Sequence, residues 1–220
     1  MLEEYQIQQN KETFLALVNS IEREGVDKER LIRQLKESDF FDAPASAMYH
    51  NAFRGGLCAH SLNVYYTLVN ICRAMYTQVD ENGECHNYEC PYSEDTLKIV
   101  ALFHDFDKMN KYERTVMNKK VYSETGSKYD EMGKYDWQSV PGYKRKEAKD
   151  IFLLGSHGEN SVYMTETFFP LSTEEHCAIM NHHGCFDNPK LDITPIFNRY
   201  SLACLLHLAD MAATYIKERT

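Results

Sequence analysis

Histidine and aspartate recur on stretches of this chain that are otherwise apolar. Five separate segments each carry such residues: His60, His104 with Asp105, His157, His182 with His183, and Asp210. Imidazole and carboxylate groups are costly to bury unless they are hydrogen-bonded or bound to a metal. A single histidine on an apolar face is most often an ordinary core residue. Because five segments share the feature, one common metal centre explains them best, and His with carboxylate suits Mn, Fe, Co, Ni or Zn.

Helices must bring these segments together, and the spacing of apolar residues predicts them. The predicted helices cover about 10–25, 27–36, 58–76, 93–108, 158–168, 172–183 and a last stretch from 194 onward. Ser93 and Ser172 are predicted N-caps. The helix that follows Ser93 is apolar nearly all round, so we expect it to be central. Residues 38–56 and 78–92 show no clear period and are interpreted as loops.

The stretch 112–146 has a different pattern. Its tyrosine-rich alternation, the turn sequence ETGSK and the pair Pro141-Gly142 predict a β-hairpin or an ordered lid. Segment 108–149 holds 11 Lys or Arg and 6 acidic residues, a balance of +5, which leaves the remainder of the chain at −14. The segment is either a solvated hairpin or a lid with basic side chains for phosphates and an aromatic one for a base.

The expected fold is all-α, a helical bundle with this hairpin inserted. We expect a single domain, in which 1–38 form N-terminal helices and 39–220 form the core, with the insertion at about 109–150. A chain of 220 residues that is 43% apolar can bury a substantial core.

Composition also limits the function classes. The net charge of −9 argues against stable binding of long nucleic acid or of a membrane surface. No apolar run approaches the roughly 20 residues of a membrane-spanning helix, and the polar first residues are unlike a secretory signal. Seven cysteines, an odd count without a regular framework, favour reduced thiols. These features predict a cytoplasmic protein.

In chain order, the segments HNAFRGGLCAHSL, HDFDK, GSHGENS, HHG and LLHLAD resemble the HD-domain phosphohydrolase superfamily. The similarity runs from about His50 to Thr214. Within the superfamily, the chain looks like the branch that includes the HD domain of bacterial 3′→5′ exoribonucleases and other two-metal HD proteins. The resemblance implies an HD-type helical bundle and a hydrolase with divalent transition metals, two ions being expected.

The resemblance also implies roles for individual residues. It makes a first set of residues the ligands of one metal: His60, His104, Asp105 and Asp210. Asp105 would bridge to a second metal held by His157 and His182, with His183 as an additional candidate ligand. Lys108 matches the lysine of the family's HDxGK motif and would neutralise phosphate charge, so the resemblance makes Lys108 and the metal-bridging Asp105 the catalytic residues. The sequence departs from that motif at Asp107, where the family usually has glycine.

Further residues are candidates for contact with substrate. His50 and Arg54 precede the Gly55-Gly56 turn near His60, and they are either polar loop residues or phosphate contacts. Lys111 and Trp137 belong to the basic, aromatic segment, where lysine suits a phosphate and tryptophan a base. His207 lies three residues before Asp210 on the same helical face, so we expect it to position that carboxylate rather than to bind metal.

The function expected from these features is hydrolysis of a phosphoester or phosphoanhydride bond of a nucleotide by a metal-bound hydroxide. Two cations polarise phosphoryl oxygens and lower the pKa of a bound water. The partner would be a small phosphate substrate, and the enzyme a nucleotidase or nucleoside triphosphohydrolase. Three alternatives stay open: a 3′→5′ exonuclease on short oligonucleotides, a non-catalytic nucleotide-binding HD sensor, and a di-iron oxygenase, which Lys108 disfavours. The sequence leaves the base, the sugar, the number of phosphates, the native metal and the oligomeric state open, a dimer included.

Overall fold

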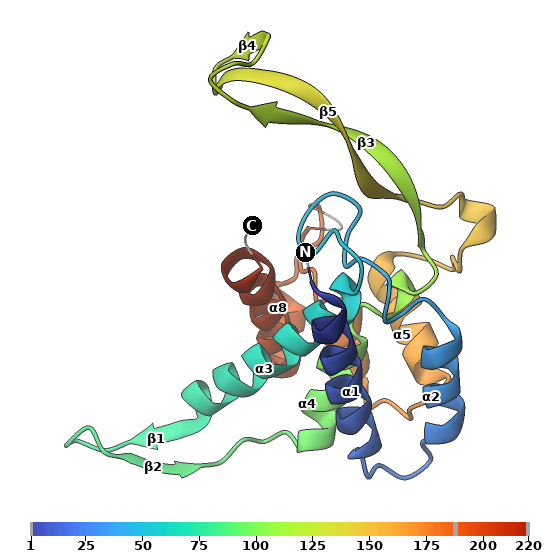
Figure 1. The fold of residues 1–220 in the computed structure, drawn as a ribbon. Helices are drawn as coiled ribbons and strands as arrows, with labels where there is room; N and C mark the ends of the chain where they lie inside the picture. The colour runs from blue at the N-terminus through green and yellow to red at the C-terminus, as the bar shows by residue number, and fades with distance from the viewer. Residues whose placement is uncertain (1, 187–188, 219–220) are drawn as a thin grey trace.

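The computed structural model describes residues 2–186 and 189–218, which form a helical body with two projecting hairpins (Figure 1). The helices are α1 (Glu4–Asn19), α2 (Lys28–Glu37), α3 (Gly56–Tyr76), α4 (Glu94–Phe103), α5 (His157–Glu166), α6 (Thr173–Met180), α7 (Thr194–Arg199) and α8 (Ser201–Ala212). A π-helical turn over Ala213–Lys217 continues α8, and 3-10 turns cover Phe106–Lys108 and Ala148–Asp150.

The strands form two antiparallel sheets. One is the small hairpin of β1 (Thr77–Val79) and β2 (Cys85–Tyr88). The other is a long ribbon in which β5 (Gly133–Arg145) pairs with β3 (Tyr112–Tyr122) along its length and with the short β4 (Lys128–Asp130) at its tip. The ribbon leaves the body near α5 and curves above it (Figure 1).

The prediction of an all-α fold is wrong. The chain is about 49% helical and 15% strand, so the fold is mixed α/β with high helical content. Strand content comes from the ribbon and also from 78–92, which was interpreted as a loop. There the Asp80 carboxylate accepts hydrogen bonds from the backbone N–H groups of Asn82 and Glu84, and this turn pairs two short polar strands. Such polar strands lack the apolar alternation that marks a strand in a sequence.

Local capping sets several helix ends. The hydroxyls of Ser93 and Ser172 accept hydrogen bonds from backbone N–H groups of α4 and α6, which confirms both predicted N-caps. The first helix starts earlier than predicted, because Glu3 N–H donates to the Gln6 side chain and opens α1 six residues before Asn10. Within 2–186 and 189–218, no helix has the length and apolar character needed to cross a membrane.

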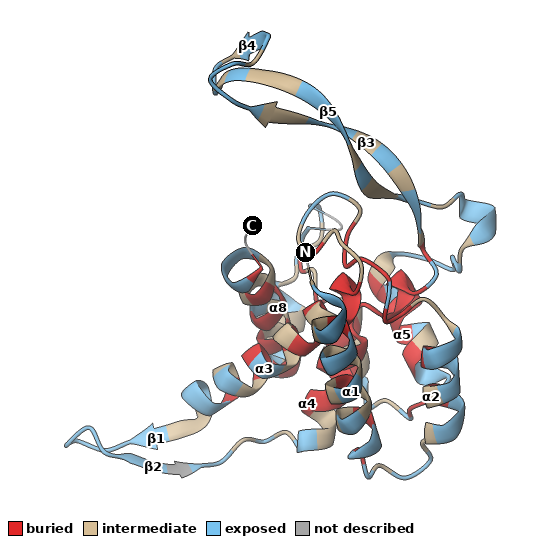
Figure 2. Ribbon diagram, viewed as in Figure 1, coloured by how far each residue is buried: buried red, intermediate tan, exposed pale blue. Residues whose placement is uncertain are grey.

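Two apolar clusters hold the body together, and α3 and α4 contribute to both. The first is rich in aromatic rings that pack edge-on or tilted, among them Phe14, Phe40, Phe103 and Phe106. The second lies among α3, α4, α6 and α8. Residues 97–103 of α4 are all buried, as expected for a central helix, and burial is concentrated where helices face each other (Figure 2). The residues that follow α4 therefore start from the middle of the molecule.

Two glycines allow close approaches that the site needs. A Cβ on Gly56 would collide with the Asn51 backbone carbonyl, so only glycine lets the loop 45–53 pack on the start of α3. A Cβ on Gly158 would collide with the Met180 carbonyl, where α5 meets the end of α6. The first contact places His60 and the second brings His157 near His182.

An ion pair ties the turn after α1 to α6. The Arg23 guanidinium donates to both oxygens of the buried Glu175 carboxylate, at 2.8 and 2.5 Å. Burial alone raises the pKa of Glu175, but hydrogen bonds from Arg23 and from the Ser172 backbone outweigh burial and lower the pKa below 4.5. The folded protein therefore favours the ionised form more than the unfolded chain does.

We expect Glu175→Gln to lower the free energy of unfolding by about 1.5–3 kcal/mol near neutral pH, the scale of a hydrogen bond to a charged group. A lowered carboxyl pKa contributes stability that is present above the unfolded value of about 4.5 and is lost as pH falls through the folded value. The difference from wild type should therefore shrink in acid. Urea unfolding across this range tests it, with the exposed Glu37→Gln as control. A pH-independent difference would contradict the ion-pair explanation.

Candidate metal centre

The carboxylate of Asp105, in the turn after α4, lies between two groups of imidazoles. Its Oδ2 atom is 3.4 Å from His60 Nε2 and 3.5 Å from His104 Nε2. Its Oδ1 atom is 2.7 Å from His157 Nε2 and 3.5 Å from His182 Nε2. Asp105 is only 1% exposed, so bulk water does not hydrate its carboxylate oxygens. One carboxylate thus faces two different sets of potential metal ligands.

The first set joins α3, the end of α4 and α8. His60 Nε2 lies 3.1 Å from Asp210 Oδ1 and 3.2 Å from His104 Nε2. Two donors that each bind a common ion at about 2.1 Å, at angles between octahedral and tetrahedral, lie roughly 3.0–3.4 Å apart. The observed separations match that range. These three residues can therefore hold one ion together with Asp105 Oδ2.

The second set joins Asp105 to α5 and to the turn after α6. Ligand atoms of Asp105, His157, His182 and His183 all lie within 4.8 Å of one another. His182 Nε2 is buried and has no hydrogen-bond partner. A buried nitrogen in that state carries a desolvation cost that a bound cation would remove. The chain thus brings together every residue that the sequence suggested as a metal ligand, His183 included.

The outer nitrogen of each principal imidazole is occupied. His104 Nδ1 donates to the Ala101 carbonyl at 2.8 Å and His182 Nδ1 to the Ile179 carbonyl at 2.6 Å. For the other two the acceptors are carboxylates, Glu218 at 3.1 Å from His60 Nδ1 and Asp107 at 2.6 Å from His157 Nδ1. With each Nδ1 hydrogen-bonded outward, each Nε2 faces the centre, which is the ring orientation of histidine metal sites generally.

Burial and neighbouring charges shift the pKa values of the carboxylate and the imidazoles at the centre. Burial raises the pKa of Asp105, but Lys108, His104 and His157 outweigh burial and keep this pKa well below its usual value. Burial lowers the pKa of His60 and His157, yet carboxylates outweigh it and raise these pKa values to about 10 and about 9. Burial dominates at His104 and lowers its pKa to about 3. Asp105 is therefore an anion surrounded by groups that respond to its charge.

Asp107, the departure from the family motif, has a structural place beside the centre. It is buried, and its carboxylate contacts His157 Nδ1 on one side and accepts from Lys111 Nζ on the other. Asp107 thus fixes the ring of His157. Lys111 is 7% exposed and pairs with Asp107, so the structure does not place it among the cavity residues where a substrate would lie.

Lys108 points to the centre itself. Its Nζ donates to Asp105 Oδ2 at 2.6 Å, and the side chain is buried. Burial lowers the pKa of Lys108, but Asp105 outweighs this and raises the pKa above its ordinary value. A fixed ammonium charge therefore lies next to the oxygen that faces the first group of ligands.

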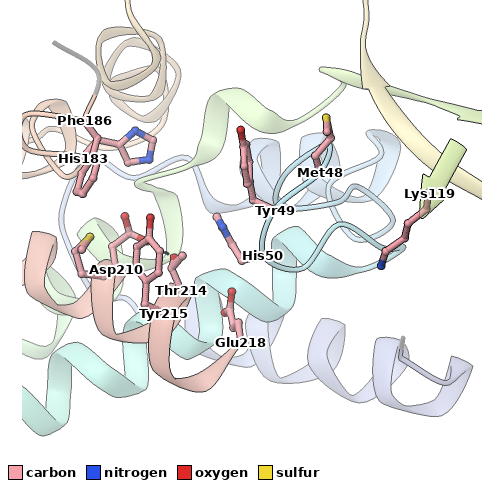
Figure 3. Close-up of a pocket in the computed structure, with 11 residues that line it drawn as sticks. Met48, Tyr49, His50, Lys119, His183, Phe186, Asp210, Thr214, Tyr215 and Glu218 are labelled. Atoms are coloured by element: carbon pink, nitrogen blue, oxygen red, sulfur yellow. Dashed lines mark hydrogen bonds between the residues drawn. The ribbon is translucent and has the colours of Figure 1, made fainter. Parts of the chain in front are cut away.

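A cavity of about 650 Å³ opens beside the first group (Figure 3). Its polar wall includes His50, His183, Asp210 and Glu218. His50 has a buried, unpartnered Nε2, and its ring centroid lies 4.7 Å from that of His60. Burial lowers the pKa of His50 to about 4, with the His60 charge acting in the same direction. Of the predicted substrate contacts, His50 is the one that the structure places at the cavity.

The structure places three other candidates elsewhere. Arg54 pairs with Glu4 and with Asp42, at 2.6 Å from the latter, and does not line the cavity. Trp137 pairs with Lys120 in the β3–β5 register and points to the opposite face of the ribbon from Lys119, which does line the cavity. His207 Nδ1 donates to the His182 carbonyl at 2.6 Å, so it positions the second group rather than Asp210.

Sequence reasoning missed Glu218 and the aromatic residues of the cavity. Glu218 is buried, faces His60 and accepts from Asn63 Nδ2 at 2.8 Å. It stands in the polar run KERT with a basic residue on each side, and a glutamate in such a run is normally exposed. Tyr49, Phe186 and Tyr215 line the cavity from three separate segments. No local spacing in the sequence relates these three positions.

Comparison with protein-family models, with curated proteins and with solved structures finds no match to this chain. The resemblance to HD-domain phosphohydrolases therefore rests on the motifs in the sequence, and membership of that superfamily stays a prediction. The buried His and Asp groups themselves are suited to bind metal ions.

We expect removal of metal by a strong chelator to lower the melting temperature by about 5–10 °C, and Mn²⁺ or Fe²⁺ to restore it. Ligand present at about 100 times its Kd stabilises by about 2.7 kcal/mol, and each kcal/mol shifts a chain of this size by about 2–4 °C. Elemental analysis should then show that His157→Ala loses about one ion and Asp105→Ala loses both. His176→Ala, whose ring contacts Glu166 away from the centre, is the control. Full metal content in Asp105→Ala would contradict this site.

Glu218→Gln should weaken one of two metal-binding steps by about 10–100-fold, the usual effect of removing a group that orients a ligand histidine. The other step should keep its affinity, because Glu218 touches His60 and not the His157 group. Calorimetric titration of the chelated protein resolves the two steps. The exposed Glu124→Gln serves as the matched control, and equal weakening of both steps would argue against separate positions.

Proposed function

We propose that this protein is a metal-dependent phosphohydrolase that cleaves a phosphoester or phosphoanhydride bond of a nucleotide. One observation carries the proposal: a single buried carboxylate directs one oxygen to each of two imidazole groups, beside an open cavity. Divalent cations, when bound there, would act as Lewis acids on phosphoryl oxygens and lower the pKa of a coordinated water. The proposal includes two such ions, of the Mn, Fe, Co, Ni or Zn class.

The chain's own residues support phosphate chemistry next to this centre. Lys108 Nζ holds a positive charge 2.6 Å from Asp105 Oδ2, where charge builds on phosphoryl oxygens in the transition state. His50 lines the cavity, and its buried Nε2 atom has no hydrogen-bond partner, which makes this residue the candidate to bond a phosphoryl or leaving-group oxygen. Asp107 and Glu218 keep His157 and His60 from rotating, so the ligand geometry is set before substrate arrives.

The cavity also supports a nucleotide as the substrate class. Its volume lies within the range of about 300–1,000 Å³ that is usual for small-molecule sites. Tyr49, Phe186 and Tyr215 line it and are 83%, 64% and 59% exposed, so their rings are available for stacking. Base–aromatic stacking contributes about 1–3 kcal/mol per base. We therefore propose that these three residues, and not Trp137, contact the base.

The proposal is tested by supplying Mn²⁺-reconstituted protein with nucleoside mono-, di- and triphosphates, short oligonucleotides and an aryl phosphate, and by separating products chromatographically. We expect release of phosphate or pyrophosphate from a mononucleotide at a higher kcat/KM than from the aryl phosphate. Turnover of oligonucleotides alone would replace the proposal by the exonuclease alternative. Saturable nucleotide binding without turnover would replace it by a sensor.

Lys108→Met should lower kcat by about tenfold to a thousandfold, the effect of losing one electrostatic donor at a developing charge. The long apolar chain of methionine fills most of the same buried space, so the metal content should be retained. Steady-state kinetics together with elemental analysis separates the two effects, with the exposed Lys128→Met as control. A loss of metal that accounts for the whole loss of rate would mean that Lys108 acts only by supporting Asp105.

A further inference from the structure

We infer that the cavity has a second anion-binding position, made by Lys119 of β3, and that the preferred ligand carries two phosphate groups on either side of one nucleoside. The inference rests on the proposed function and narrows its substrate class. Nucleoside 3′,5′-bisphosphates and 5′-phosphorylated dinucleotides share this arrangement.

Lys119 is placed to meet a ligand at the end of the cavity away from the metal centre. It is the one Lys or Arg among the described residues that line the cavity. Figure 3 shows it at one end, with His183 and Phe186 at the other and His50 and Tyr49 between them. Within 2–186 and 189–218, Lys119 makes no hydrogen bond or ion pair to a protein group, so its charge is available to a ligand.

The neighbouring lysine, Lys120, is paired within the ribbon, so the lack of a protein partner is not a general property of the lysines in β3. Lys120 donates to Asp130 at 2.6 Å and lies 4.4 Å from the Tyr135 ring centroid, on the other face of the ribbon. Successive side chains of a strand point to opposite faces. Lys119 thus faces the body, and Lys120 is used within the ribbon itself.

The charges along the cavity separate two anion positions. At the metal end the lining carboxylates Asp210 and Glu218 repel an anion unless cations are bound beside it. A phosphate there therefore requires the metal centre. At the far end, the only formal charge among the described lining residues is that of Lys119, which attracts an anion without a metal.

The stretch between the two ends suits a nucleoside. Tyr49 stands between them in Figure 3 and is mostly exposed, so its ring offers a stacking surface for a base. A nucleoside with a single phosphate would occupy the metal end and leave Lys119 without a partner. A triphosphate would concentrate its charge at the metal end. A ligand with a second phosphate on the opposite side of the nucleoside would occupy both anion positions, the metal end and the end at Lys119.

The experiment measures binding separately from turnover. Equilibrium binding to Mn²⁺-loaded protein is compared for adenosine 3′,5′-bisphosphorothioate and adenosine 5′-monophosphorothioate, analogues that resist hydrolysis. We expect wild type to bind the bisphosphorothioate about tenfold more tightly, the scale of one exposed charge-assisted hydrogen bond. Lys119→Met should reduce this ratio to about one and leave binding of the monophosphorothioate unchanged.

Lys120→Met is the matched control, since it removes the same charge one residue away on the opposite face, and it should keep the tenfold ratio. Lys119→Arg should also keep it. Added salt should reduce the ratio in wild type more than in Lys119→Met, because the contact is exposed. A wild-type ratio near one, or an unchanged ratio in Lys119→Met, would overturn the inference. Turnover of the nucleotide panel by wild type, measured in parallel, decides the proposed function independently.

Discussion

The burial of one carboxylate organises much of this molecule. Asp105 follows the most completely buried helix, so its charge cannot be hydrated and must be compensated by the protein or by a cation. Compensation comes from every side: Lys108 from the same turn, His60 from α3, His157 from α5 and His182 from the turn after α6. The packing of the helices therefore buries apolar faces and also brings these four groups to within 2.6–3.5 Å of the Asp105 oxygens.

A second set of interactions decides which nitrogen each imidazole presents. Two rings are fixed by carbonyls three residues earlier in the chain, at Ala101 and Ile179, so helix geometry alone orients His104 and His182. The other two depend on distant carboxylates: Glu218 reaches His60 across 158 positions of sequence, and Asp107 meets His157 across the contact of α5 with the turn after α4. The centre consequently couples local helix ends to the long-range packing of the chain.

This division also explains what the sequence could predict. The caps Ser93 and Ser172 and the central helix depend on neighbours within a few residues, and the structure confirms them. The convergence of His and Asp residues was predictable because polar groups on apolar helices need partners. Glu218 was not, because a glutamate in a polar run gives no sign of burial. The all-α prediction failed because strand pairing in 78–92 arises from a turn at Asp80 and not from apolar alternation.

The basic segment shows why a charge total is a poor guide to a binding surface. Its balance of +5 includes Lys108 and Lys111, which are buried against Asp105 and Asp107. Lys120 is paired with Asp130 and Lys144 with Glu113 along the ribbon. The register then places Trp137 on the face away from the cavity and Lys119 toward it. A lysine becomes available to an anion only where pairing and strand face both leave it so, and these are properties of the folded ribbon that the sum of charges does not contain.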